Sequence, residues 1–206
     1  MRLVVATRSK HKMVEIRRIL SDVPGLEILD LGDAAVAYHP DEEGLEPFAT
    51  FEENAASKAE YFQEKSGLPT VADDSGLEVD ALDGRPGVRT KRFAPGENLE
   101  GEARDRANNA HLLALLKGRP PEERGARYVC VAALATGNGE IRTFRGEAPG
   151  RVLTEGRGHG GFGYDPVIMD ENSGRSFAEL SPEEKNERSH RGRAFRSLGE
   201  FLKGKE

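Results

Sequence analysis

The chain has 206 residues, of which 36% are hydrophobic and 32% charged, and its formal net charge at pH 7 is −6. This length and composition suit one well-cored, strongly hydrated globular domain over residues 1–206, and the negative charge argues against duplex nucleic acid as a partner, although a local basic cluster can still bind a small anion. No apolar run approaches membrane-spanning length, and the start of the chain is too short and strand-like for a signal peptide, so we expect a cytoplasmic protein with no membrane partner.

The first predicted strand and helix, residues 3–6 and 11–20, are joined by a loop rich in hydroxyl groups and cations, Thr-Arg-Ser-Lys-His-Lys. A strand that enters a helix through such a loop is typical of a phosphate site. Free backbone N–H groups and the helix dipole face the anion, while Arg8, Lys10 or Lys12 supplies countercharge. The loop lacks the glycines of a P-loop or a dinucleotide fingerprint, and a solvated basic turn remains the alternative.

An acidic loop and a capped helix follow. A second strand is predicted at residues 27–31, and the carboxylates of residues 33–47 are solvated by default, although one of them could reach a metal. Thr50 and Glu53 form a capping-box pattern, which predicts a helix that ends near Gly67. The expected buried stripe of this helix is Ala55, Ala59 and Phe62.

Two adjacent carboxylates, Asp73 and Asp74, follow the β-favouring residues 70–71. A Ser-Gly pair comes directly after them and predicts a turn, so we expect the carboxylates in a strand-end loop, where α/β enzymes keep side chains both positioned and accessible. Like charges this close repel by about 4 kcal/mol at an effective dielectric near 20, and a divalent cation such as Mg²⁺ is the usual partner that offsets the repulsion. A polar turn with an Asx-type bond is the alternative.

The middle of the chain predicts a helix and a hairpin. Residues 102–117 have the apolar period of a long helix, and residues 127–136 and 140–145 read as two strands joined by Gly-Asn-Gly. An antiparallel hairpin after strand–helix units implies a mixed sheet, and hence an α/β fold. Cys130 lies in the apolar first strand of the hairpin and is expected to be a buried small hydrophobe.

A glycine-rich stretch at residues 158–166 contains two aromatic side chains. Glycines let the backbone approach a flat ligand closely, and Phe162 or Tyr164 could stack on a base. A purely structural glycine-rich turn is the alternative.

The C-terminal region opens with a second capping box, Ser-Pro-Glu-Glu from Ser181, which predicts a short helix that contains Lys185. The last helix opens near Ser189 and presents His190 and Arg191 at its N-terminus. A cation there opposes the helix dipole, which favours placement for a ligand over a cap histidine and a surface arginine.

Taken together and in this order, five stretches resemble the inosine triphosphate pyrophosphatase family. They are residues 7–12, 50–58, 72–77 with 86–87, 160–166, and 180–185 with 189–192. The resemblance implies an elongated, twisted mixed sheet flanked by helices, two lobes with a central nucleotide cleft, and a homodimer. It also implies Mg²⁺-dependent attack of water on the α-phosphorus of ITP, dITP, XTP or dXTP, which yields the nucleoside monophosphate and pyrophosphate and cleanses the nucleotide pool.

The same resemblance assigns roles to residues. Asp74 is expected to bind Mg²⁺ and accept the proton of the attacking water, with Asp73 and Glu46 as further metal carboxylates. The expected substrate-binding residues are Thr7, Arg8, Ser9, Lys10, His11, Lys12, Lys58, Ser75, Phe162, Gly163, Tyr164, Asp165, Lys185, His190 and Arg191. Within this set the N-terminal loop and Lys58 bind the triphosphate, the glycine-rich residues orient the base, and the last three donors read its edge. The family commonly has Asn where this chain has Ser9.

Discrimination between bases follows from hydrogen-bond chemistry. Hypoxanthine and xanthine carry an acceptor oxygen at position 6, where adenine has a donor amine, so donor side chains would be mispaired by adenine. Two other functions fit parts of the pattern: a Mg²⁺-dependent phosphatase that releases orthophosphate, and a nucleotide-binding regulatory module without turnover.

Overall fold

The computed structural model describes residues 1–96 and 99–204, which form two compact units. Unit 1 comprises Met1–Asp74, Cys130–Gly146 and His190–Glu206, and unit 2 comprises Ser75–Val129 and Glu147–Ser189. Three strands contribute residues to both units: β3 (Thr70–Val79), β5 (Gly125–Ala135) and β6 (Ile141–Val152). No helix in the described part of the chain is long and apolar enough to cross a membrane.

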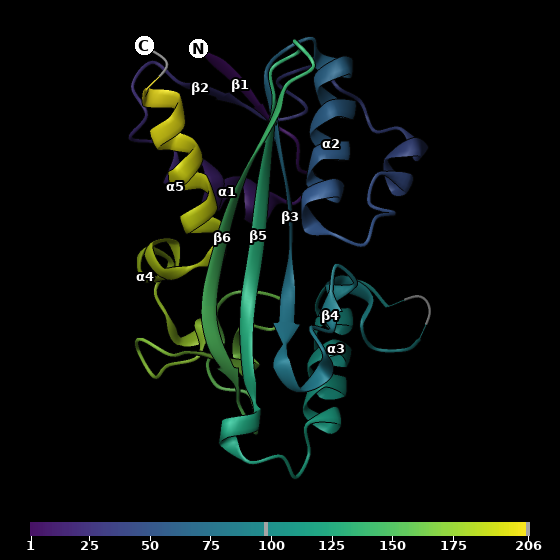
Figure 1. The fold of residues 1–206 in the computed structure, drawn as a ribbon, viewed down its shortest axis with the longest axis vertical. Helices are drawn as coiled ribbons and strands as arrows, with labels where there is room; N and C mark the ends of the chain where they lie inside the picture. Colours follow the sequence, from purple (N-terminus) through teal and green to yellow (C-terminus); the bar gives the residue numbers. More distant parts are fainter. Residues whose placement is uncertain (97–98, 205–206) are drawn as a thin grey trace. The chain divides into compact units, whose positions relative to one another are not determined.

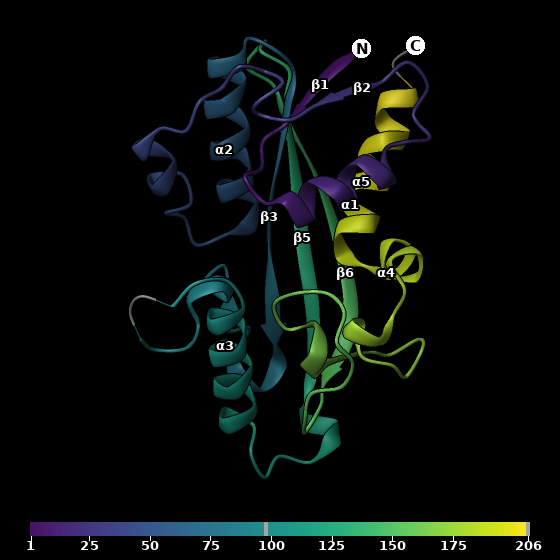
Figure 2. The same ribbon diagram turned by 180° about the vertical axis from the view of Figure 1, so that it is seen from behind.

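Unit 1 is a layered α/β structure. Its other elements are β1 (Arg2–Val5), α1 (Lys10–Ile19), β2 (Glu27–Leu29), α2 (Phe51–Ser66) and α5 (His190–Lys203). The strands follow the order β2-β1-β3-β5-β6, with β1 parallel to both β2 and β3. Helices α1 and α5 cover one face of these strands and α2 covers the other (Figure 1, Figure 2). The apolar strand β5 is buried along its unit 1 part, as predicted for a central strand, and Cys130 is buried within it.

Helix α2 begins and ends where its caps predict. The Thr50 hydroxyl accepts a hydrogen bond from the backbone N–H of Glu53, and Gly67 ends the helix in the left-handed conformation at φ 66°. The predicted capping box is only half formed, because the Glu53 carboxylate accepts from the Thr50 hydroxyl instead of the Thr50 backbone N–H. The predicted stripe of Ala55, Ala59 and Phe62 is buried.

The turn predicted after the two aspartates is wrong. Strand β3 runs through this position for 10 residues, so Asp73 and Asp74 lie inside a strand and not in a strand-end loop. The reason is packing: Leu77 and Val79, just beyond the Ser-Gly pair, are buried in the unit 2 core, and this burial outweighs the local turn preference.

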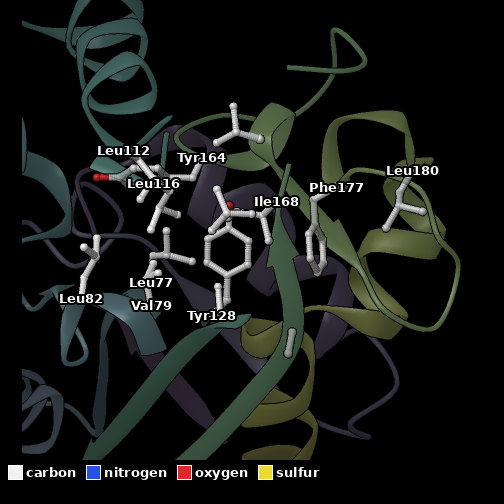
Figure 3. Packing of buried hydrophobic residues seen from close by; sticks show 14 residues of the cluster. Leu77, Val79, Leu82, Leu112, Leu116, Tyr128, Tyr164, Ile168, Phe177 and Leu180 are labelled. Atoms are coloured by element: carbon white, nitrogen blue, oxygen red, sulfur yellow. The ribbon is translucent and has the colours of Figure 1, made fainter. Parts of the chain in front are cut away.

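Unit 2 packs its remaining elements around a separate hydrophobic core (Figure 3). These elements are β4 (Pro86–Gly87), antiparallel to β3; α3 (Gly101–Leu115); β7 (Ile168–Asp170), antiparallel to β6; and α4 (Pro182–Arg188). Tyr128 and Phe177 meet edge to face at 5.2 Å in this core, and Leu112 is buried against it from α3. The capping box at Ser181 is complete. The mixed sheet with flanking helices confirms the predicted α/β fold class.

Strand β6 extends beyond the predicted end at residue 145, to Val152. The glycine that follows, Gly146, does not break the strand but lets α5 approach it. A Cβ atom at this position would lie 2.2 Å from the carbonyl oxygen of His190 and 2.5 Å from the backbone N of Ala194. Both neighbours are helix backbone, so neither can rotate away.

Replacing Gly146 with alanine is therefore expected to lower the free energy of unfolding by about 1–3 kcal/mol, the usual cost of overpacking. Urea denaturation measures this change. Gly44→Ala is the matched control, because a Cβ at Gly44 would meet no atom within 4 Å. Equal midpoints for the two variants would contradict the close approach of α5 to β6.

Candidate active site

In unit 1 a buried carboxylate is held by two cations from different helices. Asp73, 3% exposed, accepts hydrogen bonds through Oδ2 from Nζ of Lys12 at 2.9 Å and from Nη2 of Arg191 at 3.4 Å. Burial alone would raise the pKa of Asp73, but Lys12 and Arg191 outweigh it and hold the pKa well below its ordinary value. Asp73 is therefore an ionised anchor for Lys12, and the Cys130 thiol also points at it, with Sγ 3.8 Å from Oδ2. Burial and Asp73 raise the pKa of Cys130, which makes a catalytic thiolate there unfavourable.

The N-terminal loop delivers Lys12 to this cluster. Ser9 is the N-cap of α1, and its hydroxyl accepts from the backbone N–H of Lys12 at 3.3 Å. Thr7 in turn accepts from the N–H of Ser9 at 3.1 Å. Serine is as good an N-cap as asparagine, so the departure from the family pattern preserves the helix start. Lys10 and His11 are exposed on the first turn.

Arg8 binds Glu42 of the acidic loop. Its guanidinium makes two hydrogen bonds to the Glu42 carboxylate, at 2.7 and 3.0 Å, and two to the carbonyl oxygen of Val36 at 3.3 Å. This bidentate pair ties the acidic loop to the loop before α1. The predicted phosphate contact of Arg8 would require it to leave Glu42.

The second carboxylate of the pair has a different environment. Burial raises the pKa of Asp74 above its ordinary value; Lys58 opposes this rise and the Glu46 carboxylate adds to it. Nζ of Lys58 donates to the carbonyl oxygen of Asp73 at 2.6 Å and to the Glu46 carboxylate. Burial disfavours the charge on Lys58, but Glu46, Asp73 and Asp74 outweigh it and raise its pKa. Lys58 thus supplies positive charge to Glu46 and Asp74.

This chemistry suits a hard divalent cation between Asp74 and Glu46. Both supply carboxylate oxygens, which Mg²⁺ prefers, and their mutual repulsion would be relieved by a cation. Asp73, in contrast, is committed to Lys12 and Arg191. Among residues 1–96 and 99–204 no three His, Cys, Asp or Glu side chains are gathered as ligands for a metal ion. The metal set of Asp74, Glu46 and Asp73 stays a prediction.

Unit 2 carries a second polar cluster, built on Asp165. Its Oδ2 accepts from Nζ of Lys185 at 2.7 Å and from the backbone N–H of Phe162 at 2.9 Å, and its Oδ1 accepts from the hydroxyl of Tyr128 at 3.2 Å. Nζ of Lys185 lies 4.4 Å from the centroid of the Phe162 ring, a cation–π distance. Burial, with the Asp165 charge next, raises the pKa of Tyr128, so this hydroxyl stays a donor.

The glycine-rich loop is held by helix α3. The backbone N–H of Gly163 donates to Asp105 at 2.8 Å, and its carbonyl accepts from Asn109 at 3.0 Å. Tyr164 is buried in the unit 2 core, and its hydroxyl donates to the carbonyl oxygen of Thr90 at 2.8 Å (Figure 3). Of the two predicted stacking aromatics, the half-buried Phe162 is the one outside this core.

The predicted pair at the start of α5 points inward. His190 is buried, and Arg191, 1% exposed, makes ion pairs with Glu15 at 2.6 Å and with Asp73 at 3.4 Å. Burial alone would lower the pKa of Arg191, but its neighbours Asp73, Glu15 and Cys130 outweigh this effect and raise it. Ser75 follows Asp74 in β3 and is half-buried.

Sequence reasoning missed several residues that shape these clusters. They are Glu15, Asn54, Asp105, Asn109 and Tyr128. Asn54 had the most readable signal, because a buried asparagine inside a helix must hydrogen-bond to something other than that helix. The others have partners far away in the sequence.

The mixed sheet with flanking helices defines an α/β protein. Its buried lysines, which lie against carboxylates, can supply positive charge to an anionic ligand. The sequence profile of the Ham1 family matches residues 3–201, and the chain belongs to this family. It is 48% identical to the dITP/XTP pyrophosphatase of Frankia alni over 203 residues, which cover 98% of both chains. It is also 48% identical to the dITP/XTP pyrophosphatase of Geobacter sulfurreducens over 201 residues, covering 98% of this chain and 96% of that one.

Solved structures agree with the fold. The Ham1 protein of Staphylococcus aureus matches with a TM-score of 0.84 at 31% identity over 100% of both chains. The nucleoside-triphosphatase, or dITP/XTP pyrophosphatase, of Mycobacterium abscessus matches with a TM-score of 0.72 at 40% identity, covering 96% of this chain and 98% of that one. The predicted family resemblance is confirmed.

Proposed function

We propose that this chain hydrolyses the non-standard purine nucleoside triphosphates ITP, dITP, XTP and dXTP to the nucleoside monophosphate and pyrophosphate, with Mg²⁺. The observation that carries the proposal is the buried unit 1 cluster, in which Lys12 and Lys58 flank the adjacent Asp73 and Asp74. The names of relatives that match over nearly the whole chain supply the substrate class.

The unit 1 residues have distinct proposed tasks. Thr7, Ser9, Lys10, His11, Lys12 and Lys58 would bind the triphosphate, and the dipole of α1 favours an anion at the N-terminus of this helix. Asp74 and Glu46 would hold Mg²⁺, which when bound supplies charge neutralisation at the phosphates. Asp74 would also accept the proton of the attacking water, a role that suits a carboxylate whose pKa is raised by burial. Asp73 would support the site by fixing Lys12.

The unit 2 residues would bind the base. Phe162 offers a ring face, with Gly163 and Tyr164 setting its backbone, and Asp165 fixes the Lys185 ammonium beside that ring. Lys185 is a pure donor, so it would pair with the oxygen at position 6 of hypoxanthine or xanthine and would be mispaired by the amine of adenine. Ser75 would contact the substrate. His190 and Arg191, which belong to unit 1, are the other proposed donors. Because Arg191 would first have to leave Glu15 and Asp73, we assign edge reading to Lys185 first.

Steady-state hydrolysis of ITP, XTP, GTP and ATP with Mg²⁺ tests the proposal, with pyrophosphate and orthophosphate assayed separately. We expect pyrophosphate from ITP and XTP, and a preference over ATP on the order of 10⁴, as mispaired buried donors can provide. Orthophosphate as the first product would instead indicate attack at the terminal phosphorus. Absence of turnover would indicate a nucleotide-binding module.

The proposal also includes a cytoplasmic homodimer, which rests on the family resemblance, and a small-molecule substrate instead of nucleic acid, which the net charge of −6 favours. Light scattering coupled to size-exclusion chromatography measures the oligomeric state.

A further inference from the structure

One buried amide in unit 1 binds the Asp74 carboxylate and the backbone of the loop that carries Glu46, the two residues that we propose as metal ligands. Asn54 lies in the first turns of α2 and is 1% exposed. Its Nδ2 donates to Oδ2 of Asp74 at 3.0 Å and to the carbonyl oxygen of Phe48 at 3.3 Å, and its Oδ1 accepts from the backbone N–H of Phe48 at 2.9 Å. Both N–H bonds of the amide are therefore used.

The chemistry of these partners fixes which way the amide points. The N–H of Phe48 can only donate, and an ionised Asp74 can only accept. Exchanging the oxygen and nitrogen of Asn54 would set a donor against the donor of Phe48 and an acceptor against the acceptor of Asp74. The amide group of Asn54 thus has one favourable orientation. In this orientation its N–H holds Oδ2 of Asp74 in place.

The contact with Phe48 also affects Glu46, the other proposed metal ligand. Phe48 is two residues beyond Glu46, and the intervening Pro47 has a restricted φ, so holding both backbone groups of Phe48 restricts where the end of the acidic loop can lie. One turn further along α2, Lys58 holds the Glu46 carboxylate itself. Positions i and i+4 share one helix face, so Asn54 and Lys58 together connect this loop to β3.

We propose that Asn54 is a positioning residue, which rests on the proposed function: it orients the Asp74 carboxylate and keeps the Glu46 loop in register with it. Asn54 does not touch the substrate in this role. It acts through Asp74 and through the backbone of Phe48, as hydrogen-bonding partners of metal-ligating carboxylates do.

The chain offers a matched control in unit 2. Asn108 in α3 is also buried, at 3% exposed, and also clamps loop backbone with three hydrogen bonds. It accepts from the N–H of Ala94 at 2.9 Å and donates to the carbonyl oxygens of Thr90 and Lys91 at 3.4 and 3.2 Å. None of these bonds involves a carboxylate. Asn108→Ala therefore reproduces the structural cost of losing a buried loop clamp.

The test compares Asn54→Ala, Asn54→Leu and Asn108→Ala with the unmodified chain. Asn54→Leu keeps the side-chain volume, so it covers the case in which the alanine variant does not fold. Three quantities are measured: kcat and KM for ITP, the affinity of the nucleotide-free protein for Mn²⁺ by electron paramagnetic resonance, and the hydrogen-exchange rate of the Phe48 amide.

We expect both Asn54 variants to lose about 10- to 100-fold in kcat and in Mn²⁺ affinity, the usual effect of removing such a partner, with KM nearly unchanged. The Phe48 amide should exchange faster. Asn108→Ala should lose comparable stability but keep kcat and Mn²⁺ affinity. Equal losses in the Asn54 and Asn108 variants would overturn the proposal. If the unmodified protein releases no pyrophosphate, the proposed function fails, while Mn²⁺ affinity and amide exchange still decide the role of Asn54.

Discussion

Asp74→Asn is expected to lower kcat for pyrophosphate release by about 10²- to 10⁴-fold, the range that a general base contributes, while ITP binding remains measurable. The asparagine keeps the shape of the side chain but cannot accept a proton, and it is a weaker ligand for a divalent cation. Burial raises the pKa of Asp74, and the charge of Lys58 opposes this rise. The carboxylate is thus poised to take up a proton from water, and this capacity is what the substitution removes.

Steady-state kinetics and isothermal titration calorimetry with ITP separate these effects. Glu78→Gln is the matched control, because Glu78 is another carboxylate in β3 and is paired with Arg127 at 2.8 Å. It should keep the kcat of the unmodified chain. Turnover by Asp74→Asn at the unmodified rate would exclude Asp74 as the base and transfer the role to another group.

The parts of the fold that sequence predicted well are those fixed by neighbours a few residues away. The caps of α2 at Thr50 and Gly67 and the capping box at Ser181 are such cases, because hydrogen bonds within one turn decide them. Strand β3 shows the opposite case. Its Ser-Gly pair has a local turn preference, but the burial of Leu77 in a core assembled from distant segments decides the conformation.

The same distinction holds for the candidate site. The motifs identified Asp73, Lys12 and Arg191, but they did not show that Asp73 binds both cations. Asp73 is 61 residues from Lys12 and 118 residues from Arg191 in the sequence. Composition placed Arg8 in a cationic loop, whereas Glu42, 34 residues away, binds its guanidinium. The local pattern can thus predict which residues belong to the site. The partner of each charged side chain depends on the tertiary fold.

The buried ion network in unit 1 carries the largest expected effect on stability. Asp73→Asn leaves Lys12 and Arg191 buried beside a neutral amide, and removing one member of such a network typically costs about 3–5 kcal/mol. We expect a loss of this size in the free energy of unfolding, measured by urea denaturation at pH 7. Asp41→Asn is the control: this side chain is 68% exposed, and its loss should change stability by less than about 0.5 kcal/mol.

The stabilisation by Asp73 is also expected to decrease as the pH falls. Lys12 and Arg191 hold the pKa of Asp73 well below the value of about 3.9 that it has in an unfolded chain. The stability that Asp73 contributes is therefore fully present above about pH 5 and is lost as the pH falls toward its folded-state pKa. Other carboxylates titrate in both proteins and cancel, so the difference between the unmodified chain and Asp73→Asn should shrink as the pH falls below about 5, with a slope that approaches about 1.4 kcal/mol per pH unit at lower pH. A difference that stays constant from pH 6 to pH 3 would show that Asp73 has the same pKa in the folded and the unfolded protein, so that Lys12 and Arg191 do not stabilise its charge.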